Sequence, residues 1–508
     1  MADQPLTHPD HHPVLDVVVV GAGFGGLGAG AALRRAGIER FAILEKASSV
    51  GGTWRDNTYP GCACDIPSHL YSFSFAQNPG WTRRYPSQPE IEAYLERTTD
   101  DLGLRPWIRF GHEVAELRWD DGDEVWRVVL PDGREVRARA VISATGGLSR
   151  PAMADIAGLD SFAGTVFHSA RWRHDHDLTG ERVGVIGTGA SAVQLVPEVA
   201  LRAGCTTVFQ RTPPWVLPRD DRPSPDWRRR LYGRVPALQR LHRWRTYARQ
   251  ELLALAFVGP RPVRERIARR IEEAGRAHIA AHVTDPELRR QLTPTYQPGC
   301  KRILLSRDWY PTLVRPDVEL VTEAIVEVVP EGVRTADGRV HPLDAIVLAT
   351  GFTATEFLAP MAVHGVDGIA LDDHWRSGAS THLGVAVSGF PNLFLLVGPG
   401  TTLGHNSIVF MIECQLRWAM AALAESRRMG RPLEVRPEVE REEYADQQRR
   451  AAATVWASGC DSWYRSADGR LDTVWPGTSV EYWWRTRRFD PAVLRPVTSR
   501  FGAGAIDR

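Results

Sequence analysis

The stretch that decides the fold is Leu15–Gly26, LDVVVVGAGFGG. Its β-branched run predicts a buried strand that ends at Val20, directly before Gly21, Gly23 and Gly26. The pattern G-x-G-x-x-G is weak evidence by itself, and Gly23, Gly25 and Gly28 fit it as well. The preceding strand favours Gly21, Gly23 and Gly26, because it ends directly before Gly21. In such a unit the first glycine permits a tight turn and the second lets a pyrophosphate approach the backbone. The third lets the following helix pack closely on the strand.

The residues that follow complete a dinucleotide-binding unit. We expect a helix over Gly25–Ala36 and a second strand over Phe41–Leu44, which delivers Glu45. A carboxylate at this position accepts hydrogen bonds from a ribose diol and repels a 2′-phosphate. The first unit is therefore predicted to bind FAD or NAD.

A second stretch repeats the plan with a different ending. A predicted strand, Arg182–Ile186, leads into Gly187, Gly189 and Ala192. A helix is expected to follow and to run to Ala203. A second strand, Thr206–Gln210, is then followed by Arg211. Arg211 lies 24 positions after Gly187, as Glu45 lies 24 positions after Gly21. A guanidinium binds a 2′-phosphate through paired hydrogen bonds, so this unit is predicted to bind NADPH. The predicted NADPH-binding residues are Gly187, Thr188, Gly189, Ser191, Arg211 and Thr212.

Two short apolar strands that end in Ala-Thr-Gly flank the second unit. They are Ala140–Gly146 and Ala345–Gly351, and small residues at a strand end let backbone come close to a dinucleotide. We therefore predict an α/β fold with two Rossmann-like domains, the NADPH domain being inserted in the FAD domain. The expected divisions are 1–150 and 380–508 for the FAD domain and 151–379 for the NADPH domain, with a helical insertion at about 220–297.

The composition is that of an ordinary globular enzyme. A net charge of +1 gives no global reason to expect nucleic acid or an anionic membrane as partner. The run Val14–Leu33 carries Asp16 and six glycines, which argues against membrane insertion. Six cysteines in 508 residues do not make a disulfide framework. With no signal peptide at the N-terminus, a cytoplasmic protein is expected.

Two fates for the electrons compete in an enzyme that binds FAD and NADPH. A dithiol mechanism would use Cys62 and Cys64, but one intervening residue makes a strained ring, so apolar packing beside the flavin is favoured. The other acceptor is molecular oxygen.

A family resemblance supports oxygen. The stretches Gly51–Phe75, Phe162–Trp172 and Gly389–Gln415, and most of the chain around them, resemble the type I Baeyer–Villiger monooxygenases. Their fingerprint F-x-G-x-x-x-H-x-x-x-W is present as Phe162, Gly164, His168 and Trp172. Arg173 follows where the family has Pro or Asp, and this linker separates the family from its N-oxidising relatives.

The resemblance implies a reaction and a set of catalytic residues. NADPH reduces FAD, oxygen forms a C4a-peroxyflavin, and its attack on a ketone gives an ester or lactone. The alternative is N- or S-oxygenation of amines, sulfides or thioamides with the same cofactors. By the same resemblance, Arg302 is the catalytic arginine and Asp65 holds it. Lys301, one of only two lysines in the chain, joins Arg211 on the 2′-phosphate, and His168 keeps the domains in register.

Further residues match positions that surround the flavin in the family. Asn406 is expected to cap an apolar helix whose N-terminus faces the flavin, with Ser407 beside it. The FAD-binding set comprises Gly21, Gly23, Gly26, Glu45, Thr53, Trp54, Asp65, Tyr71, Val114, Asn406 and Ser407. No metal site is expected, because the histidines and cysteines lack a complete ligand set at usable spacing. The ketone stays open, since the helical segment and the tail around Trp463, Trp475, Trp483 and Trp484 are expected to shape the pocket. The oligomeric state also stays open.

The segment 222–290 carries 17 arginines and seven acidic residues. This excess suggests either a surface for nucleic acid or an anionic membrane, or a set of solvated helices. The second interpretation is favoured, because aromatic residues are not interleaved as stacking platforms. It predicts that an apolar stripe of Leu231, Leu238 and Leu241 packs inward.

Overall fold

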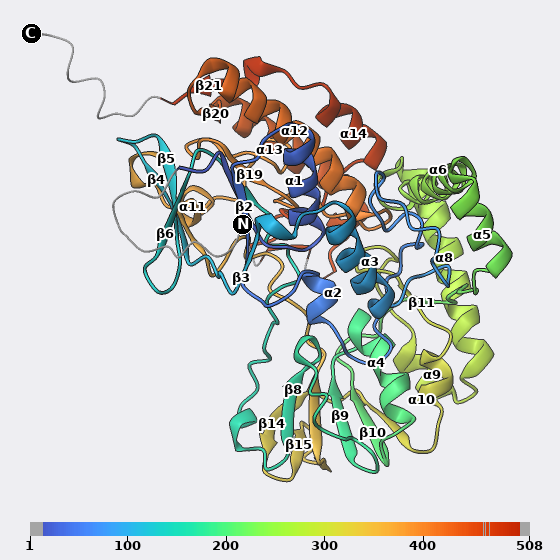
Figure 1. Ribbon diagram of the computed structural model, residues 1–508. Helices are drawn as coiled ribbons and strands as arrows, with labels where there is room; N and C mark the ends of the chain where they lie inside the picture. The colour runs from blue at the N-terminus through green and yellow to red at the C-terminus, as the bar shows by residue number, and fades with distance from the viewer. Residues whose placement is uncertain (1–13, 461, 463, 467, 498–508) are drawn as a thin grey trace, which may run out of the picture.

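The computed structural model describes residues 14–460, 462, 464–466 and 468–497. One parallel sheet lies in the upper part of the molecule in Figure 1, a second lies in the lower part, and a helical segment covers the right-hand side.

The upper sheet has the strand order β19-β7-β1-β2-β3, with all neighbours parallel. Its strands are β1 (Val17–Val20), β2 (Phe41–Glu45), β3 (Ile108–Phe110), β7 (Val141–Ser143) and β19 (Leu393–Leu395). The valines of β1 are buried on both faces, as a central parallel strand requires. The strand order reverses between β1 and β7, and in such sheets ligands bind in the crevice at that point. Helix α1 (Phe24–Arg35) follows β1 within one residue of its predicted bounds.

The lower sheet has the order β13-β10-β9-β17-β8, again parallel throughout, and differs in that its edge strand β8 comes before the glycine turn in sequence. Its strands are β8 (Thr165–His168), β9 (Arg182–Ile186), β10 (Cys205–Phe209), β13 (Val318–Val321) and β17 (Ala345–Leu348). Helix α4 (Ala190–Ala200) follows β9 and ends three residues before the predicted Ala203. All these strands lie in sequence between β7 and β19, so the second unit is inserted in the first, which confirms the predicted fold class.

Smaller sheets extend the two units. Strands β4 (Glu116–Asp120), β5 (Val125–Val129) and β6 (Glu135–Ala138) form an antiparallel meander, and β18 (Ala362–His364) joins β4 in parallel. Strands β14 (Ile325–Val329), β15 (Gly332–Thr335) and β16 (Val340–Pro342) form another meander. Short pairs form between β11 (Val216–Leu217) and β12 (Leu304–Leu305), and between β20 (Leu433–Val435) and β21 (Leu494–Pro496).

The helical segment consists of helices that follow β11 in sequence. They are α5 (Asp226–Arg234), α6 (Pro236–Leu253), α7 (Leu255–Val258), α8 (Arg261–His282) and α9 (Pro286–Leu292). The predicted inward stripe is wrong, because Leu238 and Leu241 on α6 are exposed. The inner face of α6 is polar instead: Gln239 and Arg243 donate hydrogen bonds to backbone carbonyls of the loop before α3.

The remaining helices are divided between the two sheets, and the helix Trp309–Leu313 packs on α4 and β13 of the lower one. They are α2 (Thr53–Asp56), α3 (Gln88–Asp101), α10 (Trp309–Leu313), α11 (Leu371–His374), α12 (Ile408–Met429), α13 (Pro437–Ala451) and α14 (Ser479–Arg487). Helix α12 packs against both α1 and α14 at the top of Figure 1. Within the described residues, none of the helices has both the length and the apolar character that crossing a bilayer requires.

Candidate active site

The first glycine turn is closed by backbone contacts that only glycine permits. Gly21 has a φ of +100°. A Cβ added at Gly26 would lie 1.8 Å from the carbonyl oxygen of Gly21, so α1 touches the end of β1 directly. Gly23 faces the backbone of Gly52, which leads into α2 and Thr53. This bare backbone at a helix N-terminus fits a pyrophosphate.

Glu45 ends β2 and is almost fully buried. Its carboxylate accepts hydrogen bonds from the backbone N–H groups of Ala22 at 2.8 Å and Ala47 at 3.0 Å. Arg55 donates to it at 2.9 Å. The backbone N–H of His112, two residues before the buried Val114, donates to the Glu45 carbonyl at 2.9 Å. Glu45 thus ties the glycine turn to the strand edge on which a ribose would lie.

The second turn is more open. Gly187 has a φ of +111°, while the third position is Ala192, whose methyl group the structure accommodates in full burial. The Thr188 hydroxyl donates to the carbonyl of Thr212 at 3.0 Å, which fixes the end of β10 beside the turn. Arg211, between them, is exposed. A Cβ at Gly189 would meet open space, so a ligand has access to this backbone.

The two units meet where the loop 59–64 lies on α4. Tyr59 donates to the side-chain carbonyl of Gln194 at 2.9 Å and also contacts Ser191. Gln194 donates to the carbonyl of Ala63 at 2.9 Å. Cys62 and Cys64 in this loop are free and buried. Burial raises the pKa of Cys62 to about 11 and that of Cys64 further, so both are protonated packing groups and not a dithiol.

Asp65, the residue after this loop, forms a bidentate ion pair with Arg302. The Arg302 Nε and Nη2 atoms donate to the two carboxylate oxygens at 2.8 and 2.7 Å. The charge of Asp65 is the main cause that raises the pKa of Arg302, so this cation is permanent. Two residues that the sequence places 237 positions apart therefore form one unit at the junction between the domains.

Aromatic side chains surround this pair. Trp54 donates from Nε1 to the Tyr71 hydroxyl at 3.1 Å, and Tyr71 packs edge-on against Phe24 at the start of α1. Burial raises the pKa of Tyr71, so its hydroxyl stays protonated. Tyr464, from the C-terminal tail, is buried beside Arg302. Tyr464 was not predicted from the sequence, since nothing in its local pattern marks it.

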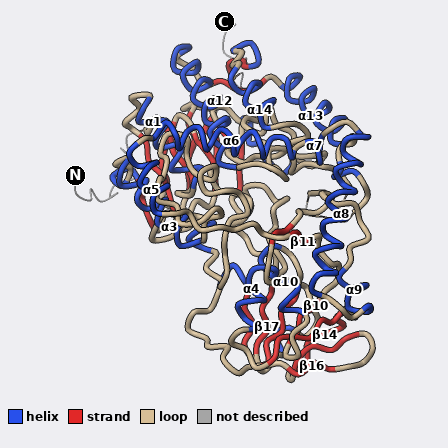
Figure 2. The backbone as a smooth tube through the Cα atoms, turned by 90° about the vertical axis from the view of Figure 1, so that its right-hand side faces the viewer, coloured by secondary structure: helices blue, strands red, loops and turns tan. Residues whose placement is uncertain are grey.

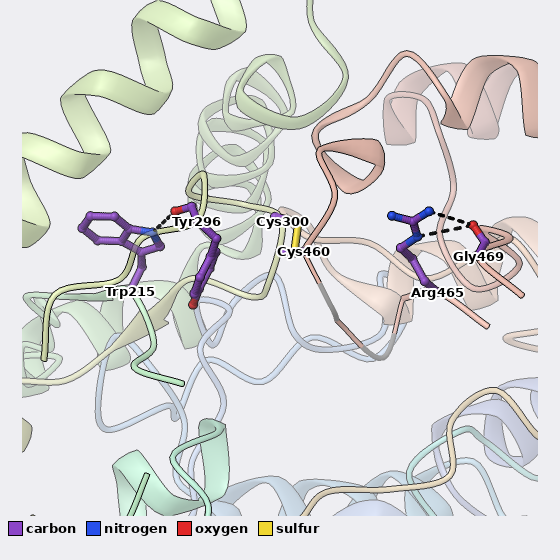
Figure 3. Close-up of a disulfide and its surroundings, with 6 residues drawn as sticks. All are labelled: Trp215, Tyr296, Cys300, Cys460, Arg465 and Gly469. Atoms are coloured by element: carbon purple, nitrogen blue, oxygen red, sulfur yellow. Dashed lines mark hydrogen bonds between the residues drawn. A yellow bond between two sulfur atoms is a disulfide. The ribbon is translucent and has the colours of Figure 1, made fainter. Parts of the chain in front are cut away.

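The pairing of β11 with β12 brings the Arg211 and Lys301 segments together. The backbone N–H of Leu304 donates to the Trp215 carbonyl at 2.8 Å. Trp215 Nε1 donates to the Tyr296 carbonyl at 2.9 Å (Figure 3). The ammonium of Lys301 lies 5.3 Å from the centre of the Tyr296 ring.

The same loop is fixed covalently to the tail. Cys300, next to Lys301, forms a disulfide with Cys460, with a Cα–Cα distance of 6.2 Å (Figure 3). No disulfide framework was expected from the six cysteines, and a spacing of 160 residues leaves no local signal for this bond. Trp463, which we expected near the pocket, lies outside the described residues.

The start of α12 differs from the prediction in one respect. Ser407, and not Asn406, occupies the N-cap position. Asn406 accepts a hydrogen bond from the Ser407 N–H at 2.8 Å and donates to Glu251 and Ser479, each at 2.9 Å. The Ser407 hydroxyl is buried and makes no hydrogen bond to any described residue. A ligand at this helix N-terminus would satisfy it, which fits the expected flavin position.

His168 ends β8 and is buried where the chain crosses between the sheets. Its Nδ1 accepts a hydrogen bond from the Ala170 N–H at 3.0 Å, and its ring packs on Phe352 after the second Ala-Thr-Gly segment. Burial lowers its pKa, so the ring is neutral. In the described ranges, His, Cys, Asp and Glu side chains form no group arranged to hold a metal ion.

Comparisons with known proteins agree with this geometry. A family model described as pyridine nucleotide-disulphide oxidoreductase matches residues 18–239, which include both glycine turns. A Baeyer–Villiger monooxygenase of Streptomyces coelicolor is 46% identical over 507 residues, covering 98% of this chain and 96% of that protein. The chain belongs to the Baeyer–Villiger monooxygenases. A second member, from Pseudomonas aeruginosa, is 42% identical over 506 residues, covering 99% of this chain and 95% of its own.

Solved structures extend the match. A structure titled OTEMO complex with FAD and NADP is 31% identical, with a TM-score of 0.85, covering 96% of this chain and all of that one. Cyclohexanone monooxygenase from Rhodococcus sp. Phi1 bound to NADP⁺ is 30% identical with the same TM-score, covering 96% of this chain and 99% of that one. The predicted enzyme class of this Baeyer–Villiger monooxygenase and its use of FAD and NADPH are thereby confirmed, and heteroatom oxygenation is not favoured.

Proposed function

We propose that this enzyme acts on ketones with NADPH and O2 in the cytoplasm and gives esters or lactones, with Arg302 as the catalytic cation. The observation that carries the proposal is the bidentate Asp65–Arg302 pair at the meeting point of the two dinucleotide units. Bound FAD, once reduced by NADPH, supplies the oxygen-activating chemistry.

The roles of the individual residues follow from their surroundings. Asp65 engages two of the five N–H donors of Arg302 and the Tyr464 side chain contacts the same guanidinium, whose remaining donors would stabilise negative charge on the reacting oxygen atoms. Trp54 and Tyr71 enclose the site with neutral rings. Gly21, Gly23, Gly26 and Glu45 hold FAD, with Thr53, Val114, Asn406 and Ser407 completing its site. Arg211 and Lys301 bind the 2′-phosphate of NADPH, with Thr188, Ser191 and Thr212 at the turn, and His168 keeps the sheets in register.

The test is product analysis with Arg302→Ala. We expect the purified variant to keep FAD and to oxidise NADPH, while ester formation falls by about 10²- to 10³-fold, the usual effect of removing a preorganised charge donor. Products from cyclic, linear and aromatic ketones, and from amines and sulfides, are identified by mass spectrometry.

Arg307→Ala is the matched control, since Arg307 is an exposed arginine on the same segment, 3.8 Å from Asp220. It should oxidise ketones at the parent rate. Ester formation by Arg302→Ala at the parent rate would remove Arg302 from the mechanism. Oxygenation of amines or sulfides with no ester from any ketone would overturn the proposed substrate class.

A further inference from the structure

The helical segment exposes apolar side chains to an unusual degree. Nine of the eighteen large apolar side chains that are exposed in the described part of the chain fall between Trp227 and Val263. Trp227, Trp244 and Leu252 are 62%, 68% and 67% exposed. Isolated apolar side chains on a surface are normal, but such a concentration marks an interaction site.

Helix α6 arranges these side chains on one side. Leu238, Leu241, Arg245 and Leu252 follow one another at spacings of three, four and seven residues, which places them on a single helix face. Trp244 borders this face, and all of these residues are exposed. Figure 2 looks onto the side of the molecule on which α5, α6 and α8 lie.

The apolar surface continues onto α14. Glu251 accepts hydrogen bonds from the Ser479 hydroxyl at 2.5 Å and the Val480 N–H at 2.9 Å, which fixes the start of α14 against α6. Val480 and Trp484 lie one turn apart on α14, and both are exposed. We call the surface formed by Trp227, Leu238, Leu241, Trp244, Leu252, Val480 and Trp484 the α6 face.

The charge around the α6 face is mainly positive, and the acidic residues that flank it, Asp226 and Glu481, are each paired with an arginine. Between Trp227 and Val263 the sequence has nine arginines and a single acidic residue, Glu251. The carboxylate of Glu251 is turned inward onto Asn406, Ser479 and Val480. The exposed arginines that remain around the face are Arg230, Arg234, Arg240, Arg245 and Arg249.

We infer that the α6 face docks on the surface of an anionic lipid bilayer. Tryptophan, leucine and arginine on one helix face are the side chains that an interfacial helix uses: the apolar groups enter the acyl boundary and the guanidinium groups bind lipid phosphates. Against a second copy, Arg245 in the middle of the stripe would meet the equivalent arginine in a symmetric contact, and like charges would repel. Against nucleic acid, exposed leucines gain nothing from phosphates. The inference is independent of the chemistry at Arg302.

Co-sedimentation with vesicles tests this inference on the FAD-loaded enzyme. We expect it to bind vesicles of phosphatidylcholine mixed with phosphatidylglycerol, to bind phosphatidylcholine alone far more weakly, and to be released by high ionic strength. The double variant Leu241→Gln/Trp244→Gln should bind at least about tenfold more weakly, because it loses both apolar contacts. Arg245→Gln/Arg249→Gln should bind more weakly and depend less on salt.

Leu201→Gln is the matched control, since Leu201 is 69% exposed on the loop after α4. It should bind vesicles like the parent, and all variants should keep their FAD. Failure of the parent to bind either vesicle would overturn the inference, as would unchanged binding by Leu241→Gln/Trp244→Gln. Capture of duplex DNA in place of vesicles would identify a nucleic-acid surface. A dimer in light scattering that Leu241→Gln/Trp244→Gln dissociates, without vesicle binding, would identify a second copy as the occupant.

Discussion

The two dinucleotide units share a topology and differ at the two positions that decide how a nucleotide is held. The third turn position is Gly26 in the first unit, where a Cβ would overlap the Gly21 carbonyl, and Ala192 in the second, where a methyl group fits. The polar residue after the second strand is Glu45, buried and held by three donors, in the first unit. In the second unit it is Arg211, which is exposed.

This difference matches the duties of the two nucleotides. A prosthetic group stays bound through many turnovers, and in the first unit the helix touches the end of the strand directly. A cosubstrate must enter and leave in each cycle, and the second unit presents its recognition group to solvent. The same strand–turn–helix unit can thus retain a nucleotide or exchange it, and the distance between the helix and the strand distinguishes the two cases.

The largest expected effect is that of Gly26→Ala. The added methyl group would lie 1.8 Å from the Gly21 oxygen, so α1 must move away from β1. We expect a destabilisation of about 1–3 kcal/mol or more, the range for forcing extra atoms into a packed core, and a purified protein without FAD. Thermal unfolding and the flavin absorbance of the purified protein measure both effects.

Ala192→Gly makes the reciprocal change in the second unit. It should cost about 1 kcal/mol through the lower helix propensity of glycine and should leave the FAD content unchanged. If Gly26→Ala retained full FAD, or if Ala192→Gly lost it, the contrast between a closed and an open turn would be broken.

The intermediate effect is that of Arg211→Gln and Lys301→Gln on nucleotide preference. Loss of a charge-assisted hydrogen bond to the 2′-phosphate removes about 1.5–3 kcal/mol, so we expect the KM for NADPH to rise roughly 10- to 100-fold in Arg211→Gln. The KM for NADH should not change, because NADH lacks that phosphate. Steady-state kinetics with both nucleotides measures the ratio.

Because Arg211 is exposed, its replacement by glutamine should leave the packing of the core unchanged. Lys301→Gln should act in the same direction and by a smaller factor, because Lys301 comes from the loop paired through β11 and β12. A KM for NADPH that neither change alters would place the 2′-phosphate elsewhere.

The strands and glycine turns that have a local pattern in the sequence were predicted correctly. The strand before Gly21 and the two glycine turns each have a signature within about thirty residues. Asp65 and Arg302 were named from the family resemblance. The disulfide of Cys300, the position of Tyr464 beside Arg302 and the role of Glu251 arise from contacts between distant segments and leave no such signature. The prediction that Leu238 and Leu241 pack inward was wrong, because the core side of α6 carries Gln239 and Arg243, which bind backbone carbonyls, beside the buried Tyr247.

The smallest effect concerns the contact between the two units, the loop 59–64 on α4. If Cys62 and Cys64 are packing groups, Cys62→Ala and Cys64→Ala should oxidise ketones with NADPH at close to the parent rate. Because the pKa of Cys62 is raised to about 11, its thiolate fraction at pH 8 is about 100-fold or more below that of an ordinary cysteine. Iodoacetamide at pH 8 should therefore label neither residue, and labelling should grow only as the pH rises toward 11.

Cys205 provides the internal control, because it is the free cysteine that is partly exposed in the described part of the chain. Mass spectrometry of the digested protein should find the label on Cys205 in the parent and nowhere in Cys205→Ser. Rapid labelling of Cys62 or Cys64 after reduction by NADPH, together with loss of turnover in their alanine variants, would show that the junction carries electrons. The electrons would then pass from the first unit to sulfur. The contrast between a unit that retains FAD and a unit that exchanges NADPH would no longer describe the whole reaction.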